Sequence, residues 1–191
     1  MANLTERAMA QALSKLLETR TLDKITIRDI TDECGLTRNT FYYHFHDVYE
    51  LMGWFFKQKT DEIMNQYRIE SDWEGGLEAT LEYLYQHRQM MIHIHESISE
   101  DLLLRFINDV MLRHAEVIVA QQAKGQKHSE KAIAIAAELY MNAAVGDVMG
   151  WIRRGMDHKP EYLAQVYNTI FLGTIRSVLD SAEKAIKDSV S

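Results

Sequence analysis

The chain of 191 residues is long enough for one sizeable hydrophobic core, and its 47% apolar residues, single proline and lack of low-complexity stretches favour a compact helical fold. Residues 1–59 hold eight basic and eight acidic side chains while residues 60–191 hold 13 and 20. This excludes indiscriminate coating of nucleic acid but permits DNA contact through a few placed groups. Neither a signal peptide nor an apolar run of about 18 to 20 residues is found, so we expect a cytoplasmic protein.

Two helices are predicted at the start of the chain. Apolar residues recur at i, i+3 and i+4 between Thr5 and Thr19, a spacing typical of an amphipathic helix. Thr26 and Asp29 form a T-x-x-D capping box that starts a second helix. Gly35 follows it, where a chain often turns into the left-handed conformation to end a helix.

A third helix completes a helix-turn-helix. Thr37 caps it, and Phe41 and Phe45 lie four residues apart, so they share the face that packs on the first two helices. The stretch GLTRNTFYYHF interleaves polar side chains with these aromatics. On the remaining faces, Arg suits guanine, Asn suits adenine, and hydroxyl groups suit phosphates or bases. Residues 1–46 are therefore predicted to be a helix-turn-helix DNA-binding domain.

The stretch KITIRDITDECGLTRNTFYYHFHDVYEL resembles the DNA-binding domain of the TetR family of bacterial transcriptional regulators. The resemblance includes the T-x-x-D box, the glycine and the FYYHF that ends the recognition helix. It implies a homodimer that binds a palindromic double-stranded DNA operator and has an all-α domain for dimerisation and effector sensing. One feature departs from the family: His46 and Val48 stand where a basic pair such as Lys-x-Lys is usual. This departure predicts a weak dependence of DNA affinity on salt concentration.

Carried over by position, the resemblance implies nine DNA-binding residues. The first threonine is expected at a phosphate, the arginines, asparagine and later threonines at bases or phosphates, and the last three side chains along the groove. The residues are Thr26, Arg28, Thr37, Arg38, Asn39, Thr40, Tyr42, Tyr43 and His44. Two alternatives stay open: a helical corner that binds no DNA, and packing of Tyr43 on the next helix.

Residues 47–191 are predicted to form a helical ligand-binding and dimerisation domain. Residues 47–68 make a linking helix that Asp47 caps, and Ser97 with Glu100 is expected to form another capping box. Further helices are expected near residues 76–87, after Glu100, from Ser129 to about Arg154, and from Pro160 onward.

The last two helices are expected to form the dimer interface. Small residues amid large ones in YMNAAVGDVMGW allow close helix approach, and the last helix is apolar on more than one face. The alternative is a pair of ordinary core helices, and the family resemblance favours a four-helix dimer interface. The residues expected there are Ala144, Val148, Trp151, Tyr167, Ile170, Phe171, Thr174 and Val178.

The C-terminal sequence also suggests an effector class. The stretch GWIRRGMDHKPEYL resembles a TetR subgroup that includes regulators associated with dihydroxyacetone kinase. This resemblance allows the effector to be a partner protein instead of a small molecule. Methionines at 90, 91, 111, 141, 149 and 156 could line an adaptable pocket or simply fill the core.

No metal or cofactor is predicted. His93 and His95 with His87 suggest a metal site, but residues two apart point to different sides of a helix. The common catalytic signatures are missing, so no enzyme is expected. The predicted function is a sequence-specific transcriptional regulator, a repressor that an effector releases. The alternatives are an activator working with a protein coactivator, a binding module without DNA function, and an enzyme with an unrecognised site.

Overall fold

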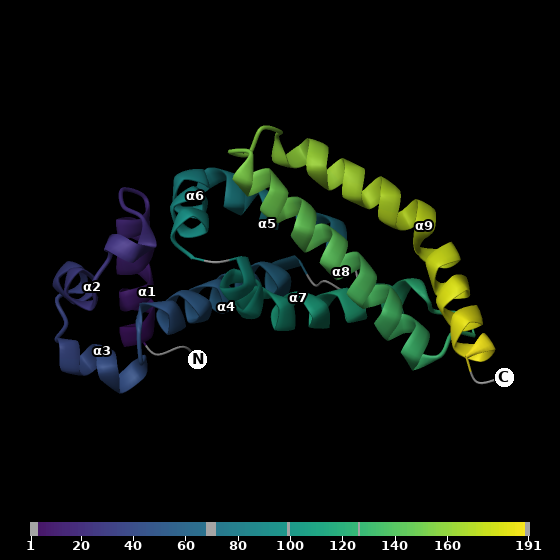
Figure 1. The fold of residues 1–191 in the computed structure, drawn as a ribbon, viewed down its shortest axis with the longest axis horizontal. Helices are drawn as coiled ribbons and strands as arrows, with labels where there is room; N and C mark the ends of the chain where they lie inside the picture. Colours follow the sequence, from purple (N-terminus) through teal and green to yellow (C-terminus); the bar gives the residue numbers. More distant parts are fainter. Residues whose placement is uncertain (1–3, 68–71, 99, 126, 190–191) are drawn as a thin grey trace. The chain divides into compact units, whose positions relative to one another are not determined.

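The computed structural model describes residues 4–67, 72–98, 100–125 and 127–189, and all regular secondary structure within them is helical. The all-α fold expected from the sequence is confirmed (Figure 1). The elements are α1 Leu4–Leu17, η1 Leu22–Lys24 (a 3₁₀ helix), α2 Ile27–Cys34, α3 Arg38–His44, α4 Val48–Tyr67, α5 Trp73–Gln86, α6 Arg88–Ser97, α7 Glu100–Gln122, α8 Glu130–Arg153 and α9 Pro160–Asp188.

The chain divides into two compact units. Unit 1 comprises Met1–Asp61 and Gln86–Ile107, and unit 2 comprises Glu62–Tyr85 and Asn108–Ser191. Unit 1 therefore contains the predicted DNA-binding domain together with most of α4 and all of α6. The sequence pattern did not predict α6 as a separate helix.

The core of unit 1 is built by the predicted apolar faces. The α1 helix packs against α2 and α6, and α2 packs against α3. Leu13, Ile30 and Phe41 are fully buried there. Phe45 is buried as well, and its ring meets Trp54 edge-on at a centroid distance of 6.0 Å. The two phenylalanines of FYYHF thus anchor α3, as their spacing predicted.

Local hydrogen bonds set the orientation of α3. Thr26 Oγ1 accepts the N–H of Asp29 at 3.2 Å, and the Asp29 carboxylate accepts the N–H of Thr26 at 2.8 Å, which completes the predicted capping box. Gly35 ends α2 with φ of 66° in the left-handed region. Thr37 Oγ1 then accepts the N–H of Thr40 at 3.1 Å and caps α3. The turn between α2 and α3 is therefore specified residue by residue.

Ser97 fastens α6 within unit 1. The predicted capping box of Ser97 and Glu100 is wrong, because Ser97 is the last residue of α6. Its hydroxyl oxygen accepts the N–H of Leu22 at 2.7 Å. His93 adds a second link, with Nδ1 2.7 Å from the carbonyl oxygen of Leu17. These partners are far away in sequence, so local spacing could not reveal them.

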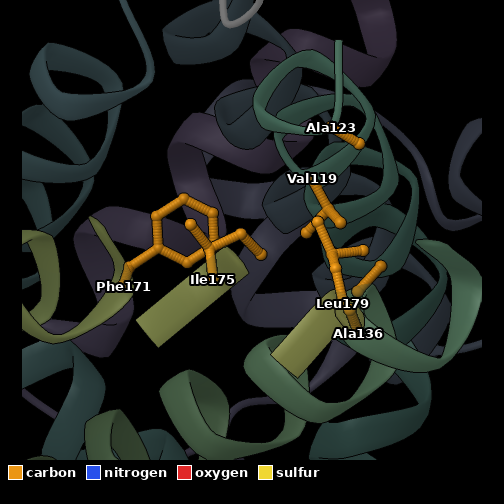
Figure 2. Packing of buried hydrophobic residues seen from close by; sticks show 7 residues of the cluster. Val119, Ala123, Ala136, Phe171, Ile175 and Leu179 are labelled. Atoms are coloured by element: carbon orange, nitrogen blue, oxygen red, sulfur yellow. The ribbon is translucent and has the colours of Figure 1, made fainter. Parts of the chain in front are cut away.

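The core of unit 2 lies between α7, α8 and α9. The α8 and α9 helices pack as an antiparallel hairpin (Figure 1). Figure 2 shows Val119 of α7, Ala136 of α8 and three α9 side chains, Phe171, Ile175 and Leu179, gathered in one cluster. All five are buried. The apolar pattern of the last helix thus serves at least partly as core.

Hydrogen bonds close the α8–α9 hairpin at both ends. At the turn, the indole N–H of Trp151 donates to the carbonyl oxygen of His158 at 3.0 Å, and Pro160 starts α9 as predicted. At the other end, the N–H and hydroxyl of Ser129 donate to the Glu183 carboxylate at 2.9 and 2.7 Å. The backbone N–H of Ser129, followed by its hydroxyl, lowers the pKa of Glu183.

By length and composition, one described helix, α8, could cross a membrane. This is weak evidence, because a core helix of a folded domain meets the same criterion. Ala136 and Ala137 of α8 are fully buried against the rest of unit 2. Packing within unit 2 therefore accounts for part of the hydropathy of α8, because 33% of its most apolar stretch is buried.

Candidate DNA-binding surface and ligand cavity

The start of α3 presents two polar side chains suited to base recognition. Arg38 and Asn39 are exposed in its first turn, and the described part of the chain gives neither side chain a hydrogen bond or ion pair. Arg and Asn have the donor and acceptor geometry to read guanine and adenine in the major groove. Their donors and acceptors are available to an outside partner.

Two exposed aromatics follow on the same helix. Tyr42 is 58% exposed and Tyr43 is 85% exposed. Tyr43 therefore does not pack on α4, which was the alternative left open for it. The Tyr42 ring meets the buried Phe41 edge-on at a centroid distance of 5.9 Å, but most of its surface is exposed. The hydroxyl groups of both tyrosines suit contacts with phosphates or bases.

His44 does not lie on this surface. Its side chain is only 10% exposed, and Nδ1 lies 3.4 Å from a carboxylate oxygen of Glu6 on α1. The expectation that His44 lines the groove is therefore wrong. At the last turn of α3, this position faces α1 instead of the side that carries Tyr43.

The helix caps limit how the threonines could meet a phosphate. The hydroxyl of Thr26 donates to the Asp29 carboxylate at 2.6 Å, so its hydrogen is already engaged. Thr37 and Thr40 share a hydrogen bond between their hydroxyl oxygens at 2.9 Å. A phosphate beside Thr26 would therefore be bound mainly by the free backbone N–H groups at the start of α2. The hydrogen bonds from Thr26, first from its hydroxyl and then from its N–H, lower the pKa of Asp29 to about 2.

Carboxylates partly neutralise the basic groups of unit 1. Arg28 Nε lies 3.3 Å from Asp32, and both side chains are exposed. Such a surface ion pair is worth little, so Arg28 can exchange its partner for a phosphate. Arg20 pairs with Asp29 at 3.3 Å in the same way. These ion pairs reduce the number of phosphate charges that the surface can neutralise. The exposed His46, which stands where the family usually has a basic residue, has the same effect.

Unit 2 contains a cavity of about 300 Å³ that the sequence did not locate. Met111 and Met141, two of the methionines considered for a pocket, lie in its wall, whereas Met90, Met91, Met149 and Met156 are buried in the cores. The lining residues are Met64, Trp73, Leu77, Thr80, Met111, His114, Ala115, Ile118, Val119, Tyr140, Met141, Ala143, Ala144, Asp147, Tyr167, Ile170 and Phe171. Its size and its mostly apolar wall are typical of small-molecule sites.

Two polar side chains of the cavity interact. Tyr167 is half-buried, and burial, followed by the charge of Asp147, raises the pKa of Tyr167 to about 12, which Arg154 opposes. At neutral pH the Tyr167 phenol therefore keeps its proton and remains a hydrogen-bond donor. Asp147 is exposed and adds a carboxylate to the wall.

The residues expected at a dimer interface fall into several groups. Ala144, Tyr167, Ile170 and Phe171 line the cavity. Val148 is half-buried, Thr174 is exposed, and Val178 packs beside the core cluster. Trp151 is fully buried and stacks on Tyr85 at 6.1 Å. A direct contact of the Trp151 ring with a second copy, expected from the sequence, is therefore wrong.

Several apolar residues of α8 and α9 are exposed, and Ile170 is one of them. Ile135, Leu139, Ile170 and Leu172 have exposed fractions between 42% and 55%. Gly146 lies on the same face of α8 as Ile135 and Leu139 by helical spacing. A Cβ atom built at Gly146 or at Gly173 of α9 would meet no described heavy atom within 4 Å. The described residues therefore give no packing reason for glycine at either position.

Two of the three histidines considered as metal ligands, His87 and His93, have other contacts. His93 Nδ1 faces a carbonyl oxygen of α1 and must donate to it, and Nε2 lies 2.9 Å from the side-chain nitrogen of Gln89. His87 Nδ1 lies 3.0 Å from Glu18. Both side chains serve the attachment of α6 to α1.

Family models match both parts of the chain. A model described as "Bacterial regulatory proteins, tetR family" matches residues 11–52, and one described as "Transcriptional regulator C-terminal region" matches residues 71–173, more than half of the chain. The chain belongs to the TetR family of bacterial regulatory proteins. It is thus a DNA-binding transcriptional regulator, in agreement with the surface on α3.

This TetR-family chain is also similar to individual regulators. The HTH-type dhaKLM operon transcriptional activator DhaS of Lactococcus lactis subsp. lactis is 25% identical over 128 residues, which cover 65% of this chain and 66% of that protein, just under two thirds. The solved structure of a dihydroxyacetone kinase operon activator DhaS has a TM-score of 0.73 at 20% identity and covers 91% of this chain and 97% of that chain. Both agree with the subgroup that the C-terminal sequence suggested.

A third likeness concerns the fold alone. The fatty acid degradation regulator FadR from Bacillus halodurans has a TM-score of 0.67 at 13% identity, and the match covers 92% of this chain and 98% of that chain. The helical architecture is therefore shared among regulators whose sequences differ widely.

Proposed function

We propose that the protein is a cytoplasmic repressor, without catalytic activity, that binds a palindromic operator as a homodimer and releases it when an effector occupies the cavity of unit 2. The observation that carries this proposal is the pairing of unengaged Arg38 and Asn39 at the start of α3 with an apolar cavity elsewhere in the same chain. The first feature suits base readout and the second suits a small molecule.

The exposed apolar side chains of α8 and α9 support the homodimer. Ile135, Leu139 and Leu172 would be buried by a second copy, and the open glycines Gly146 and Gly173 would let the helices approach closely. Two identical recognition helices then meet two half-sites about one DNA turn apart, ~34 to 36 Å centre to centre. An effector that favours another separation lowers operator affinity by population shift.

The experiment is to measure operator binding and oligomeric state of the double variant Arg38→Ala, Asn39→Ala. We expect loss of specific binding with the molecular mass of a dimer retained, because both side chains are exposed and outside the interface. The matched control, Asn65→Ala, alters an exposed asparagine on α4 and should leave binding unchanged. Unchanged operator binding by the double variant would contradict the site assignment, and a monomeric wild type would contradict the homodimer.

A second candidate function is transcriptional activation together with a partner protein. The relatives named DhaS are described as activators, which favours this sign of regulation. A reporter gene placed behind the operator distinguishes repression from activation. Expression that falls when the protein is supplied supports a repressor, whereas expression that rises supports an activator.

A further inference from the structure

The cavity of unit 2 has a carboxylate, that of Asp147, in its wall. Among the described residues that line it, Asp147 is the one carboxylate, and no lysine or arginine joins it. The nearby Arg154 donates from Nε to the Asp157 carboxylate at 3.1 Å and is not part of the wall. A ligand with a negative head would therefore meet the like charge of Asp147, with no lysine or arginine in the wall to offset it, although His114 and Tyr167 could donate hydrogen bonds to it.

Two hydroxyl groups of the cavity wall, those of Thr80 and Tyr140, already donate hydrogen bonds within the protein. Thr80 Oγ1 donates to the carbonyl oxygen of Gly76 at 2.8 Å. Thr174 Oγ1 donates to the carbonyl oxygen of Ile170 at 2.6 Å, so Tyr140, 2.7 Å from Thr174 Oγ1, is the donor in that pair. Both wall residues, Thr80 and Tyr140, therefore offer only acceptor capacity to a ligand.

Trp, Tyr and Phe rings also line the cavity. The Trp73 ring meets Phe171 edge-on at 4.9 Å, and Tyr140 meets Phe171 at 4.8 Å. Tyr167 adds a fourth ring to the cavity. The faces of such rings attract cations, most strongly where water is excluded.

We infer that the cavity binds a hydrophobic organic cation, with the positive head held by Asp147 and the aromatic rings and the apolar body against the methionines and Ile118. A cation gains from the carboxylate, from the ring faces and from the acceptor oxygens. An anion of the same shape is repelled by the carboxylate and gains only from the donors His114 and Tyr167. The acidic second part of the chain, with 20 acidic and 13 basic residues after residue 59, further favours approach of a cation. The inference rests on the proposed function only for the ligand's role as effector.

The test compares three probes with the same eight-carbon chain: octyltrimethylammonium, n-octanol and n-octanoate. Binding to the full-length protein is measured by calorimetry and by tryptophan fluorescence, since Trp73 lines the cavity. We expect the cation to bind roughly tenfold more tightly than the alcohol, as a charge-assisted contact provides. Octanoate should bind most weakly. Octanoate binding as tightly as the cation, or no binding of the cation, would overturn the inference.

Two matched variants on α8 locate the charge. Asp147→Asn should lower the affinity for octyltrimethylammonium roughly tenfold while leaving that for octanol unchanged. Glu138→Gln removes an exposed carboxylate of the same helix that does not line the cavity, and should change neither affinity. Equal effects of the two variants on cation affinity would show that general charge, not the cavity, attracts the probe, and would overturn the assignment.

Operator binding in the same samples separates this inference from the proposed function. Intact operator binding without cation binding would defeat the ligand class and leave the DNA-binding regulator standing. Cation binding that does not alter operator affinity would keep the cation site and contradict its role as effector.

Discussion

Adjacent residues of α3 differ in what they face. Tyr43 is almost fully exposed, whereas the side chain of His44 is nearly buried beside Glu6. The sequence alone assigned both to the DNA groove, because the family resemblance gives positions but no side-chain directions. Burial in the structure separates a contact residue from a packing residue.

Alanine substitutions test this separation. Tyr43→Ala should change the free energy of unfolding by no more than about 0.5 kcal/mol, because the ring is 85% exposed and touches the rim of His44 edge-on at a centroid distance of 5.0 Å. If Tyr43 contacts DNA as proposed, the same substitution should weaken operator binding. His44→Ala should lower the free energy of unfolding by about 1 kcal/mol through lost packing against α1. Urea denaturation and operator titration of both variants measure the two effects. Equal stability losses for the two variants would contradict the distinction.

The Thr26–Asp29 capping box predicts an acid-sensitive α2. The pKa of Asp29 in the folded chain, about 2, lies below its ordinary value of 3.8. The stabilising contribution of the carboxylate is therefore complete above about pH 4 and is lost as the pH falls through about 2. Thr26→Ala removes the main cause of the shift. The free energy of unfolding of this variant should fall less steeply between pH 4 and 2 than that of the wild type, and an identical pH slope would contradict the assignment.

At the scale of elements, the sequence predicted the helix caps and turns that depend on neighbouring residues. The caps at Thr26 and Thr37, the glycine turn and the start of α9 at Pro160 all depend on residues within one helical turn. The attachment of α6 and the cavity depend on partners far apart in the chain. Neither leaves a local pattern. The sequence therefore missed the attachment of α6 and did not locate the cavity, although it named Met111 and Met141 among possible lining residues.

Two glycines are expected to respond in opposite ways to alanine. Gly35→Ala should lower the free energy of unfolding by about 1 kcal/mol, because φ at this position is 66°. Gly146→Ala should raise helix stability by up to about 1 kcal/mol, because it lies inside α8 with open space around it. Thermal and urea unfolding measure both values. If Gly146 lies at the dimer interface, the same substitution should also weaken dimerisation in sedimentation experiments.

A single substitution can remove the hydrogen bond that links α6 to η1. Ser97→Ala removes the acceptor of the Leu22 N–H, which is partly buried. Leaving such a donor without a partner costs about 1 to 3 kcal/mol. Hydrogen exchange at Leu22 should accelerate accordingly, while exchange in the α8–α9 hairpin should not change. Unaltered protection of Leu22 would show that the hydrogen bond contributes nothing.

At the scale of the whole molecule, the charge distribution predicts weak salt dependence of DNA binding. Residues 1–59 are neutral overall, and several basic side chains of unit 1 pair with carboxylates. His46→Lys restores one cation of the usual family pair. The slope of log affinity against log salt concentration should steepen by about one unit for each protomer. Gln165→Lys, on an exposed position of α9, should leave the slope unchanged, and equal slopes for both variants would contradict the placement of the phosphate contact.

The central claim is that two copies of this chain read a palindrome through α3. The most direct test is selection of bound sequences from random duplex DNA with the wild type and with the Arg38→Ala, Asn39→Ala variant. The proposal predicts that the wild type recovers a palindrome with half-sites about one DNA turn apart and that the variant recovers none. Recovery of the same palindrome by both proteins, or of no sequence by a folded wild type, would contradict it.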